Sequence, residues 1–378
     1  MKNYHFFPVF LALLASYIGL HLYSASWFSR AFAVSSVTAR NLRLLFLLLA
    51  LFAPFTMFMR HRTASPELEW FYAAGYSWMG IIFLAGAGFI FADLIWLGLK
   101  YLPGPAGLQY YRYGVLTAVG IIIACAFYDG SKAPGIKELS IAVPGLPSAM
   151  EGLRIAQISD IHIDSEYKLR LFSDTVDGVN AAKPDLVLFT GDLVDPGLPS
   201  IARLGELVRK LKPRLGVYGV LGNHEYYFGY ERSLACYREF GINLLKNEAA
   251  DVAGIRLIGL NDILTEKMTE NDVENILKRH YRPGVSLLMT HQPLMYPLMA
   301  ENGIFVGFSG HTHRGQIFPF NIFTRIIYKY FYGLYRVKNS VFYVTSGTGT
   351  WGPPMRWLAP SEIPVITLTG SRTTGLKL

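Results

Sequence analysis

The chain is poor in cysteine and in charge. Its 378 residues include only two cysteines, Cys125 and Cys236, which excludes a fold stapled by several disulfides. Only 16% of the residues are charged and 52% are hydrophobic, which excludes a disordered chain and a wholly soluble one. The sequence also lacks a Gly-rich phosphate cradle, a Ser nucleophile elbow and zinc-finger spacing. Kinase, serine-hydrolase and DNA-binding functions therefore have no support.

Charge is scarcest in the first third of the chain. Residues 1–128 hold eight Lys/Arg and three Asp/Glu, whereas the other 250 residues hold 27 and 24. Most of the net charge of +8 therefore lies beside apolar runs. This pattern is typical of membrane anchors that face anionic lipid, so we expect a lipid bilayer as a partner and no nucleic acid.

Four apolar runs are long enough, or nearly so, to cross the hydrocarbon core, which takes roughly 20 residues. They cover residues 8–28, 42–59, 71–99 and 113–128. The first run follows Lys2 and also resembles a cleaved signal peptide. Because three more runs follow, we expect an uncleaved anchor and an N-terminal α-helical transmembrane bundle of about four helices over residues 1–128.

The side of the membrane is not decided by the basic residues that flank these runs. They are Arg30, Arg40 and Arg43 on one side, and Arg60, Arg62 and Lys132 on the other. The three arginines after the first run outnumber Lys2 before it, which favours an extracytoplasmic C-terminal domain. We expect an integral protein of the cell (inner) membrane.

Asp93 is the one charged residue inside the third apolar run. An acidic group in a membrane can mark an ion or proton site. Because Asp93 lies near the end of the run, we favour the alternative that it reaches toward water or pairs with a nearby arginine.

Residues 129–378 have the composition of a soluble domain in which strands and helices alternate. This alternation favours an α/β domain. Strands are predicted over 153–158, 186–190, 215–221, 256–260, 286–290, 304–309, 341–345 and 365–368. Helices are predicted over 168–182, 200–211, 230–240 and 271–280.

Side chains that bind metals follow five of these strands. They are Asp160 and His162, then Asp192, then Asn223 and His224, then His291, and finally His311 and His313. Open α/β sheets place their ligand sites at the carboxyl ends of strands. Residues two apart on a strand point to the same face, so Asp160 and His162 can aim at one centre, as can His311 and His313.

The residue types select the metal. Carboxylates, imidazoles and an amide without a thiolate suit Mn, Fe, Zn, Co or Ni rather than a structural zinc or a calcium site. Four His, two Asp and one Asn are too many for one ion and enough for two. Two ions that share a carboxylate activate water and clamp a phosphoryl group.

In order along residues 153–316, the motifs Asp-x-His, Gly-Asp, Gly-Asn-His-Glu, His and Gly-His-Thr-His resemble those of the calcineurin-like metallophosphoesterase superfamily. The flanking sequence is similar to a bacterial branch of membrane-anchored or exported members. The resemblance covers roughly residues 139–368. It implies that residues 129–378 form a catalytic domain with a two-sheet αββα sandwich, which composition alone does not predict.

The resemblance also assigns roles. It implies that Asp160, His162 and His313 bind a first divalent metal, that Asp192 bridges, and that Asn223, His291 and His311 bind a second, the metals being Mn, Fe or Zn. His224 is then a catalytic residue that protonates the leaving group, with Asp195 as its acidic neighbour. Arg314 stands where the branch usually has glycine. It either binds the substrate phosphate bidentately or is a plain surface arginine.

The aromatic and basic segment 318–336 contains Arg325, Lys329 and Arg336 and no acid. It is either a packed loop or an interfacial segment beside a bilayer. We expect a phosphoesterase that cleaves a phosphodiester or pyrophosphate bond, in an amphipathic, lipid-linked substrate. The alternatives are a phosphodiesterase for soluble molecules such as cyclic nucleotides and a non-catalytic metal-binding membrane receptor.

Overall fold

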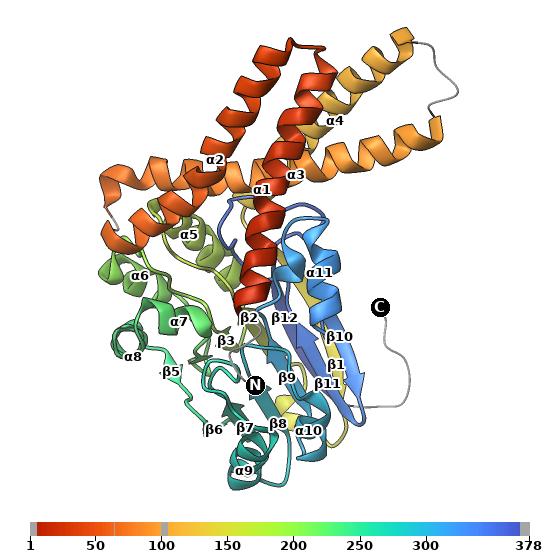
Figure 1. Cartoon of the computed structure of the whole chain (residues 1–378). Coiled ribbons are helices and arrows are strands. Elements are labelled where there is room, and N and C mark those ends of the chain that lie inside the picture. The colour runs from red at the N-terminus through yellow and green to blue at the C-terminus, as the bar shows by residue number, and fades with distance from the viewer. Residues whose placement is uncertain (1–5, 64, 100–104, 371–378) are drawn as a thin grey trace. The chain divides into compact units, whose positions relative to one another are not determined.

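The computed structural model describes residues 6–63, 65–99 and 105–370 (Figure 1). Lys2 lies outside the described residues. The chain divides into two compact units. The helical unit contains Met1–Tyr128 and Gly352–Trp357, and the α/β unit contains Asp129–Trp351 and Leu358–Leu378.

The helical unit contains four long helices, as the sequence predicts. They are α1 (Phe6–Ala31), α2 (Ser36–Thr63), α3 (Glu69–Leu99) and α4 (Pro105–Ser131), with the short 3₁₀ helix η2 (Pro66–Leu68) before α3. Each is long and apolar enough to cross a membrane. The helices extend beyond the apolar runs because the flanking Ser, Thr and Arg residues also tolerate helical backbone.

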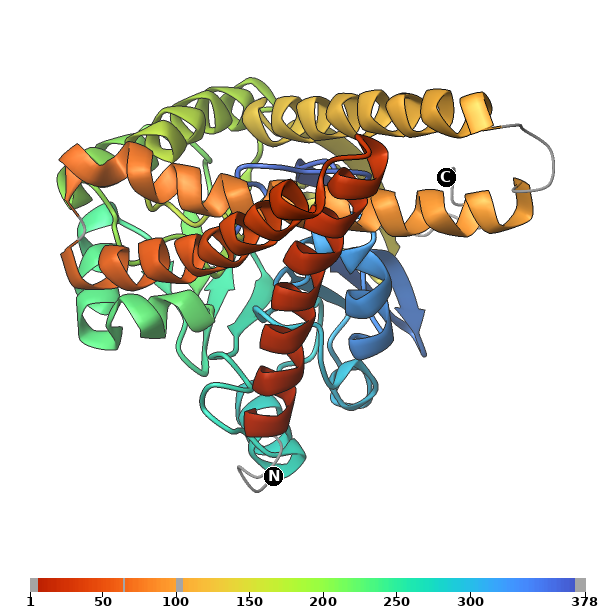
Figure 2. The ribbon, with the colours of Figure 1, turned by 45° about the horizontal axis from the view of Figure 1, so that its top comes forward.

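Small residues let the four helices approach closely. Helices α1, α2 and α3 pack against one another (Figure 2), and α3 approaches α4 at Gly88. A Cβ atom on Gly75 would overlap Thr56, one on Gly86 would overlap Leu20, and one on Gly88 would lie 2.7 Å from Val119. Close approach through glycine is typical of helix packing in lipid.

Asp93 pairs with an arginine, as expected. Its Oδ2 accepts hydrogen bonds from Arg30 (2.9 Å) and from the hydroxyl of Tyr23 (2.8 Å), and its Oδ1 accepts one from Nε1 of Trp27 (3.1 Å). The three donors lie on α1 and the acceptor lies on α3. The carboxylate therefore joins two helices.

A second stretch of chain, Gly352–Trp357, completes the helical unit. Met355 and Arg356 are fully buried there. The backbone N–H of Arg356 donates to the carbonyl of Ala126 on α4 (2.8 Å). Gly80 of α3 lies so close to Met355 that a Cβ atom on Gly80 would overlap the Met355 sulfur.

The α/β unit contains two six-stranded sheets. The first has the order β1 (Gly135–Val143), β12 (Glu362–Gly370), β2 (Arg154–Ile158), β3 (Leu186–Thr190), β4 (Val217–Val220) and β5 (Asn243–Leu244). The second has the order β10 (Gly333–Val337), β11 (Ser340–Val344), β9 (Val306–Ser309), β8 (Ser286–Met289), β7 (Ile255–Gly259) and β6 (Glu248–Val252). Strands β2 to β5 are mutually parallel, and so are β7, β8, β9 and β11.

The sheets pack face to face, because alternate residues of each strand point to opposite sides. Leu186 and Leu188 of β3 belong to the core between the sheets, whereas Val187 and Phe189 belong to the core beneath the helices. Helices α5 (Glu166–Ala181), α6 (Ile201–Val208) and α8 (Tyr230–Phe240) cover the first sheet, and α9 (Glu270–His280) and α10 (Tyr296–Glu301) cover the second. The predicted αββα sandwich is therefore confirmed.

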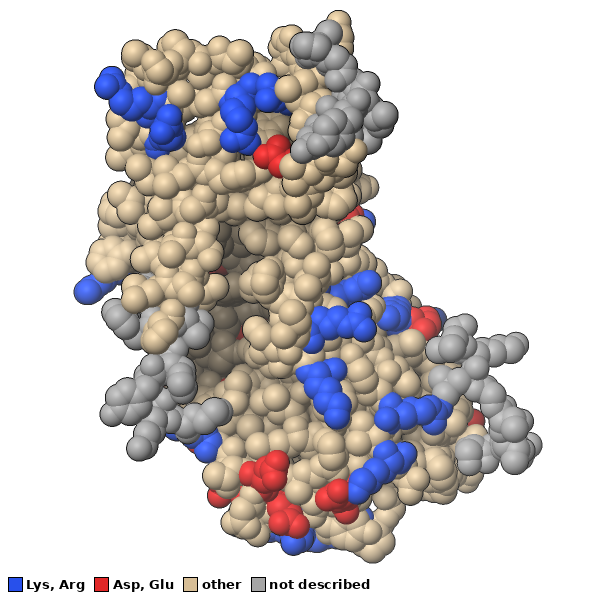
Figure 3. Space-filling model, turned by 45° about the vertical axis from the view of Figure 1, so that its right-hand side comes forward, with Lys and Arg blue, Asp and Glu red and all other residues tan. Residues whose placement is uncertain are grey.

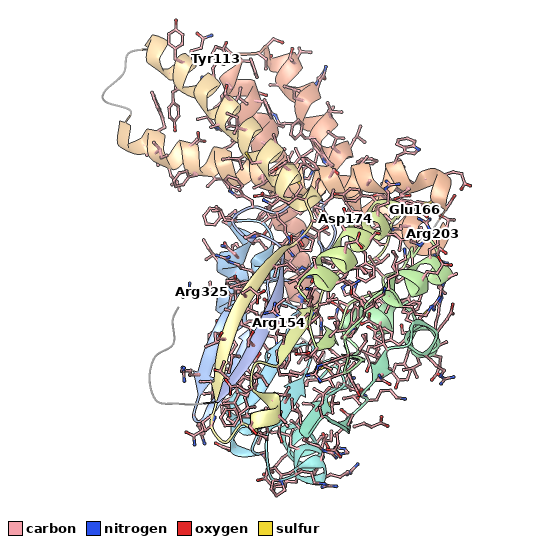
Figure 4. All side chains as sticks on the ribbon, turned by 180° about the vertical axis from the view of Figure 1, so that it is seen from behind. Tyr113, Arg154, Glu166, Asp174, Arg203 and Arg325 are labelled. Atoms are coloured by element: carbon pink, nitrogen blue, oxygen red, sulfur yellow. The ribbon has the colours of Figure 1, made fainter. Side chains whose placement is uncertain are left out.

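Ion pairs and short elements complete the α/β unit. Arg203 of α6 forms an ion pair with Glu166 of α5 at 2.7 Å (Figure 4).

The short elements are η3 (Ser148–Met150), α7 (Asn223–Phe228), η4 (His313–Gly315) and α11 (Phe320–Ile327). Each predicted strand and helix of this unit is present, with bounds that shift by a few residues. The sequence did not predict β1, β5, β6, β10, α7, α10 or α11.

Candidate metal centre

The carboxyl ends of five strands carry the predicted metal ligands. Strands β2, β3 and β4 are parallel neighbours, as are β8 and β9, so within each sheet these ends meet at one edge. The residues after them are Asp160 and His162 (β2), Asp192 (β3), Asn223 and His224 (β4), His291 (β8), and His311 and His313 (β9). The structure brings all of them together.

The turns that carry these side chains have unusual backbone. Asp160, His162, Asp192, His311 and His313 have φ between 49° and 70°, in the left-handed region that L-residues rarely adopt. Each such residue costs about 1–3 kcal/mol and persists only where the surroundings impose it, which is common at functional sites. Here the left-handed turns direct the side chains toward one another.

Asp160, His162 and His313 form the first group, and each offers a ligand atom within 4.8 Å of the others. Nε2 of His162 lies 3.0 Å from Nε2 of His313, and Oδ1 of Asp160 lies 3.6 Å from the latter nitrogen. Asp160 is held by the backbone N–H of His311 (2.9 Å) and by the hydroxyl of Ser159 (2.5 Å).

Asp192, His291 and His311 form the second group. Nε2 of His291 lies 3.1 Å from Nδ1 of His311, 3.1 Å from Oδ2 of Asp192 and 3.1 Å from Oδ1 of Asn223. Asn223 therefore adds an amide oxygen to this group.

Asp192 lies between the two groups. Its Oδ2 is 3.1 Å from His291 in one group and 3.7 Å from His162 in the other. Gly222 allows this carboxylate to approach, because a Cβ atom at that position would overlap Oδ1 of Asp192. One carboxylate thus reaches both groups of ligand atoms.

The second nitrogen of three imidazole rings is fixed by a neighbour. Nδ1 of His291 donates to the carbonyl of Thr190 (2.8 Å), Nδ1 of His162 donates to Asp195 (3.0 Å), and Nε2 of His311 lies 2.8 Å from the hydroxyl of Tyr328. Metal-binding histidines are held in this way, with one nitrogen bonded outward and the other facing the ion. The nitrogens that remain are the ones that converge in the two groups.

Burial and charge set the protonation of the second group when no metal charge is present. Burial raises the pKa of Asp192, but the positive charge of His291 outweighs it and holds that pKa well below its usual range. Burial lowers the pKa of His291, but the Asp192 carboxylate raises it well above the ordinary value. Burial and the charge of His291 lower the pKa of His311 to about 3. A cation is therefore favoured between these side chains.

The donor atoms fit two divalent ions. Imidazole nitrogens that face each other at 3.0 and 3.1 Å repel unless a cation or a proton lies between them. The sets combine nitrogen and oxygen without thiolate, which suits Mn, Fe or Zn. Residues Asp160, His162 and His313 can hold one ion, and Asp192, Asn223, His291 and His311 can hold the other.

His224 lies beside both groups and forms its own pair with Asp195. Its Nδ1 is 2.6 Å from Oδ1 of Asp195, and its ring centroid is 4.4 Å from that of His162. Burial lowers the pKa of His224, but the carboxylates of Asp192 and Asp195 outweigh it and raise the pKa to about 9. The hydrogen bonds from His162 and His224 outweigh burial and hold the pKa of Asp195 well below its usual range.

Glu225 has a structural role beside the ligand groups. Its buried carboxylate accepts hydrogen bonds from the backbone N–H groups of Asp192, Leu193, Val194 and Gly222 at 2.7–3.1 Å. The carboxylate therefore fixes the turn after β3 against the start of α7. The Gly-Asn-His-Glu motif contains Glu225, and its place three residues after Gly222 is a capping signal.

The sequence did not predict two exposed aromatic rings beside His224. The ring centroid of Tyr227 lies 5.1 Å from that of His224, and that of Trp351 lies 6.3 Å from it. Tyr227 is 60% exposed and Trp351 is 47% exposed. The amide of Gln316 fixes the backbone of Trp351 through two hydrogen bonds (2.8 and 2.9 Å). Two accessible aromatic rings therefore flank His224.

Arg314 lies one residue beyond His313, in left-handed backbone with φ 52°. Its guanidinium carbon lies 4.3 Å from the ring centroid of Tyr332, a cation–π contact. The side chain is partly buried. This position is next to the first group of ligand atoms.

The sequence profile of the calcineurin-like phosphoesterase family matches residues 153–315. An uncharacterized metallophosphoesterase of Helicobacter pylori (strain J99) is 34% identical over 276 residues, which cover 71% of this chain and 74% of that protein. An uncharacterized metallophosphoesterase of Campylobacter jejuni is 31% identical over 255 residues, 66% of this chain and 67% of that protein.

Similarity is not confined to bacteria. A "transmembrane protein with metallophosphoesterase domain" of Danio rerio is 34% identical over 269 residues, which cover 67% of this chain and 61% of that protein. A membrane-spanning part and this type of domain thus occur together in a vertebrate relative.

Proposed function

The chain belongs to the calcineurin-like phosphoesterase family, and on this premise we propose that it hydrolyses a phosphodiester or pyrophosphate bond in a lipid-linked substrate. It is a metal-dependent phosphoesterase with a dinuclear divalent centre, and a membrane protein. Beyond this family activity, we propose the class of substrate, the roles of the site residues, and the membrane and side on which the catalytic unit lies. It is supported by four apolar helices in the same chain as the catalytic unit, because these keep the site close to lipid.

Each ligand residue has a proposed role in this reaction. Asp160, His162 and His313 would hold one ion, Asn223, His291 and His311 would hold the other, and Asp192, which lies between the two groups, would contribute to both. When bound, the ions supply Lewis-acid stabilisation of the phosphoryl oxygens and activation of water. The carboxylates and the outward hydrogen bonds of the histidines keep the ligand atoms in position.

His224 is the proposed general acid. Because Asp195 accepts the hydrogen bond of Nδ1 at 2.6 Å, the other proton of the imidazolium resides on Nε2 and is available to the leaving-group oxygen. This pair, beside two groups of ligand atoms, is the observation that carries a catalytic function. A metal-binding receptor would have no use for such an acid.

The rings of Tyr227 and Trp351 favour a second candidate substrate. A leaving group that takes its proton from His224 would lie between two exposed aromatic rings. Such rings stack well on flat groups such as nucleobases. A soluble cyclic nucleotide, or a nucleotide linked to a lipid, would fit this surface.

A substrate panel tests the function. The full-length protein, purified with Mn, would be assayed against lipid pyrophosphates, lipid phosphodiesters and soluble diesters. We expect turnover of a lipid-linked substrate, and activity on soluble diesters alone would reject that class. The His224→Ala variant should retain its metals and lose nearly all turnover. If the unaltered protein binds metal but hydrolyses nothing in the panel, the receptor alternative gains support.

We also propose that the protein resides in the cell (inner) membrane with the α/β unit on the extracytoplasmic side. The support is Arg40 and Arg43 at the start of α2 and Arg30 at the end of α1, which favour a cytoplasmic position for the loop between them. Labelling of single cysteines on α9 in intact cells with a membrane-impermeant thiol reagent tests the orientation. Labelling only after lysis would place the α/β unit on the cytoplasmic side.

A further inference from the structure

Helix α11 presents its apolar side to the outside. Five of its eight residues are large and apolar, and all five are between 45% and 77% exposed: Phe320, Ile322, Phe323, Ile326 and Ile327. Its polar residue Thr324 is buried, and Asn321 packs against Gly315, where a Cβ atom would overlap the Asn321 backbone.

This arrangement is the reverse of an ordinary surface helix, whose apolar stripe faces the core. Helix α9 in the same unit follows the ordinary rule, because Val273, Ile276 and Leu277 are buried and its charged residues face outward. Single exposed apolar residues are common, but a continuous apolar face marks an interaction site. Phe318, just before α11, is also exposed.

The chain around α11 is rich in positive charge. Residues 310–337 contain four Lys and Arg residues, Arg314, Arg325, Lys329 and Arg336, and no Asp or Glu. Arg325, Lys329 and Arg336 are exposed, and Arg325 lies on the outside of the α/β unit (Figure 4). Figure 3 brings the side with α11 and β10 forward and shows Lys and Arg gathered on a largely uncharged surface.

The apolar face is held firmly next to the metal centre. Tyr328, the residue after α11, lies 2.8 Å from Nε2 of His311, and the hydroxyl of Thr312 donates to the carbonyl of Phe331 at 2.7 Å. Both contacts join the chain after α11 to the loop that carries His311 and His313. Whatever covers α11 therefore lies beside the site.

We propose that α11 docks in the surface of an anionic bilayer, with its apolar face among the upper acyl chains and the nearby cations at the phosphates. Apolar and aromatic side chains on one face, with cations and no acids around them, are what an in-plane interfacial helix requires. The four apolar helices of the same chain keep a bilayer within reach. This docking surface does not depend on the reaction that the site catalyses.

Depth measurement by electron paramagnetic resonance tests the docking. The full-length protein with Cys125→Ala and Ile326→Cys, in nanodiscs that contain phosphatidylglycerol, would carry a spin label at residue 326. Cys236 is buried and should not react. The label should collide with oxygen more than with an aqueous nickel complex, at a depth of about 5–10 Å below the headgroups. This readout needs no turnover, so it stands apart from a failure of the proposed function.

Two labelled positions are controls. Arg325→Cys lies on the same helix and should report a shallower position. Asn275→Cys on α9 should meet only the aqueous complex. A label at residue 326 that behaves like the one at residue 275 overturns the proposal. So does a label shielded from both reagents, because it would show that a second copy or another part of the chain covers α11.

Turnover gives a second measurement. In the Ile326→Glu, Ile327→Glu double variant, the ratio of turnover on a lipid-embedded ester to turnover on a water-soluble ester should fall by at least about tenfold, since burial of one isoleucine changes a partition constant by that much or more. The matched variant Ile326→Leu, Ile327→Leu should keep the ratio. An unchanged ratio in the glutamate variant would contradict the docking.

Discussion

The carboxylate of Asp195 accepts a hydrogen bond from Nδ1 of His224 at 2.6 Å. Its other oxygen accepts one from Nδ1 of His162 at 3.0 Å. The sequence pointed only to the first of these contacts. One carboxylate thus orients both the proposed acid and a proposed metal ligand, so its effects on proton transfer and on metal binding can be measured separately.

Replacement of Asp195 by asparagine should lower kcat by about 10²–10⁴-fold, the usual contribution of a positioned acid or base. The amide cannot hold His224 as an imidazolium with the same orientation. The kcat would be measured with Mn, and the bound metal by elemental analysis. Asp174→Asn, an exposed change on α5 (Figure 4), should have no effect. A fully active Asp195→Asn enzyme would contradict the assignment.

Protonation of His224 should make the stability of the metal-free protein depend on pH. The folded-state pKa of about 9 lies above the unfolded value of about 6.5. The contribution, on the order of 3 kcal/mol, is therefore fully present below about pH 6.5 and is lost as the pH rises through about 9. The Tm difference between the chelated wild type and His224→Asn should shrink over this range. A constant difference would show that the charge of His224 does not stabilise the fold.

Loss of His291 should remove one metal ion. Its Nε2 contacts Asp192, Asn223 and His311 at 3.1 Å. Mn at about 100 times its Kd should stabilise the wild type by about 2.7 kcal/mol per site through mass action. His291→Ala should bind one ion fewer and show a smaller rise in Tm. His280→Ala is the matched control, because His280 contacts the carbonyl of Asn247, away from the ligand groups. Equal metal content in both variants would reject the role of His291.

Replacement of Arg314 by glycine separates strain from substrate binding. Glycine adopts φ 52° freely, which relieves about 1–2 kcal/mol of backbone strain and offsets the lost contact with Tyr332. Stability should therefore change little. If Arg314 binds the substrate phosphate, kcat/KM should fall by about 10–100-fold, the value of a charged hydrogen bond. Arg314→Lys should be intermediate. An unchanged kcat/KM would identify a plain surface arginine.

Asp93 should stabilise the helical unit without a role in catalysis. Asp93→Ala removes the acceptor for Tyr23, Trp27 and Arg30, and each hydrogen bond between membrane helices contributes about 0.6–1.7 kcal/mol. The variant should unfold at a lower temperature in detergent and should still hydrolyse a soluble ester. An ion or proton site would instead cost turnover at unchanged stability.

The sequence was sufficient for the parts of the fold in which residue pattern and environment agree. Strands such as β3 consist of consecutive buried residues, four of five of them apolar, and the membrane helices are long apolar runs. The edge strands β1 and β10 were missed because their residues are mostly half-buried or exposed, so neither strand forms a continuous apolar run. Helix α7 was missed because it has six residues and owes its start to the Glu225 carboxylate, a contact made across the chain.

The ligand residues were recognisable from their order along the chain, but their surroundings were not. The left-handed backbone of Asp160 and His311 is uncommon for any residue other than glycine, so the sequence does not predict it. Tyr328, which contacts His311, follows α11 in the chain, and Trp351, which contacts His224, is more than 120 residues away from it in the sequence. Such contacts depend on tertiary structure.

The position of Gly352–Trp357 affects how the enzyme can be produced in parts. A gene fragment that starts at residue 129 deletes the four apolar runs but still encodes Met355 and Arg356, which pack against Gly80 and Ala126 of the deleted helices. These residues would then lose those contacts, five residues or fewer beyond Trp351. A soluble catalytic fragment therefore has to be designed with residues 352–357 replaced by a polar turn as well as with the N-terminus removed.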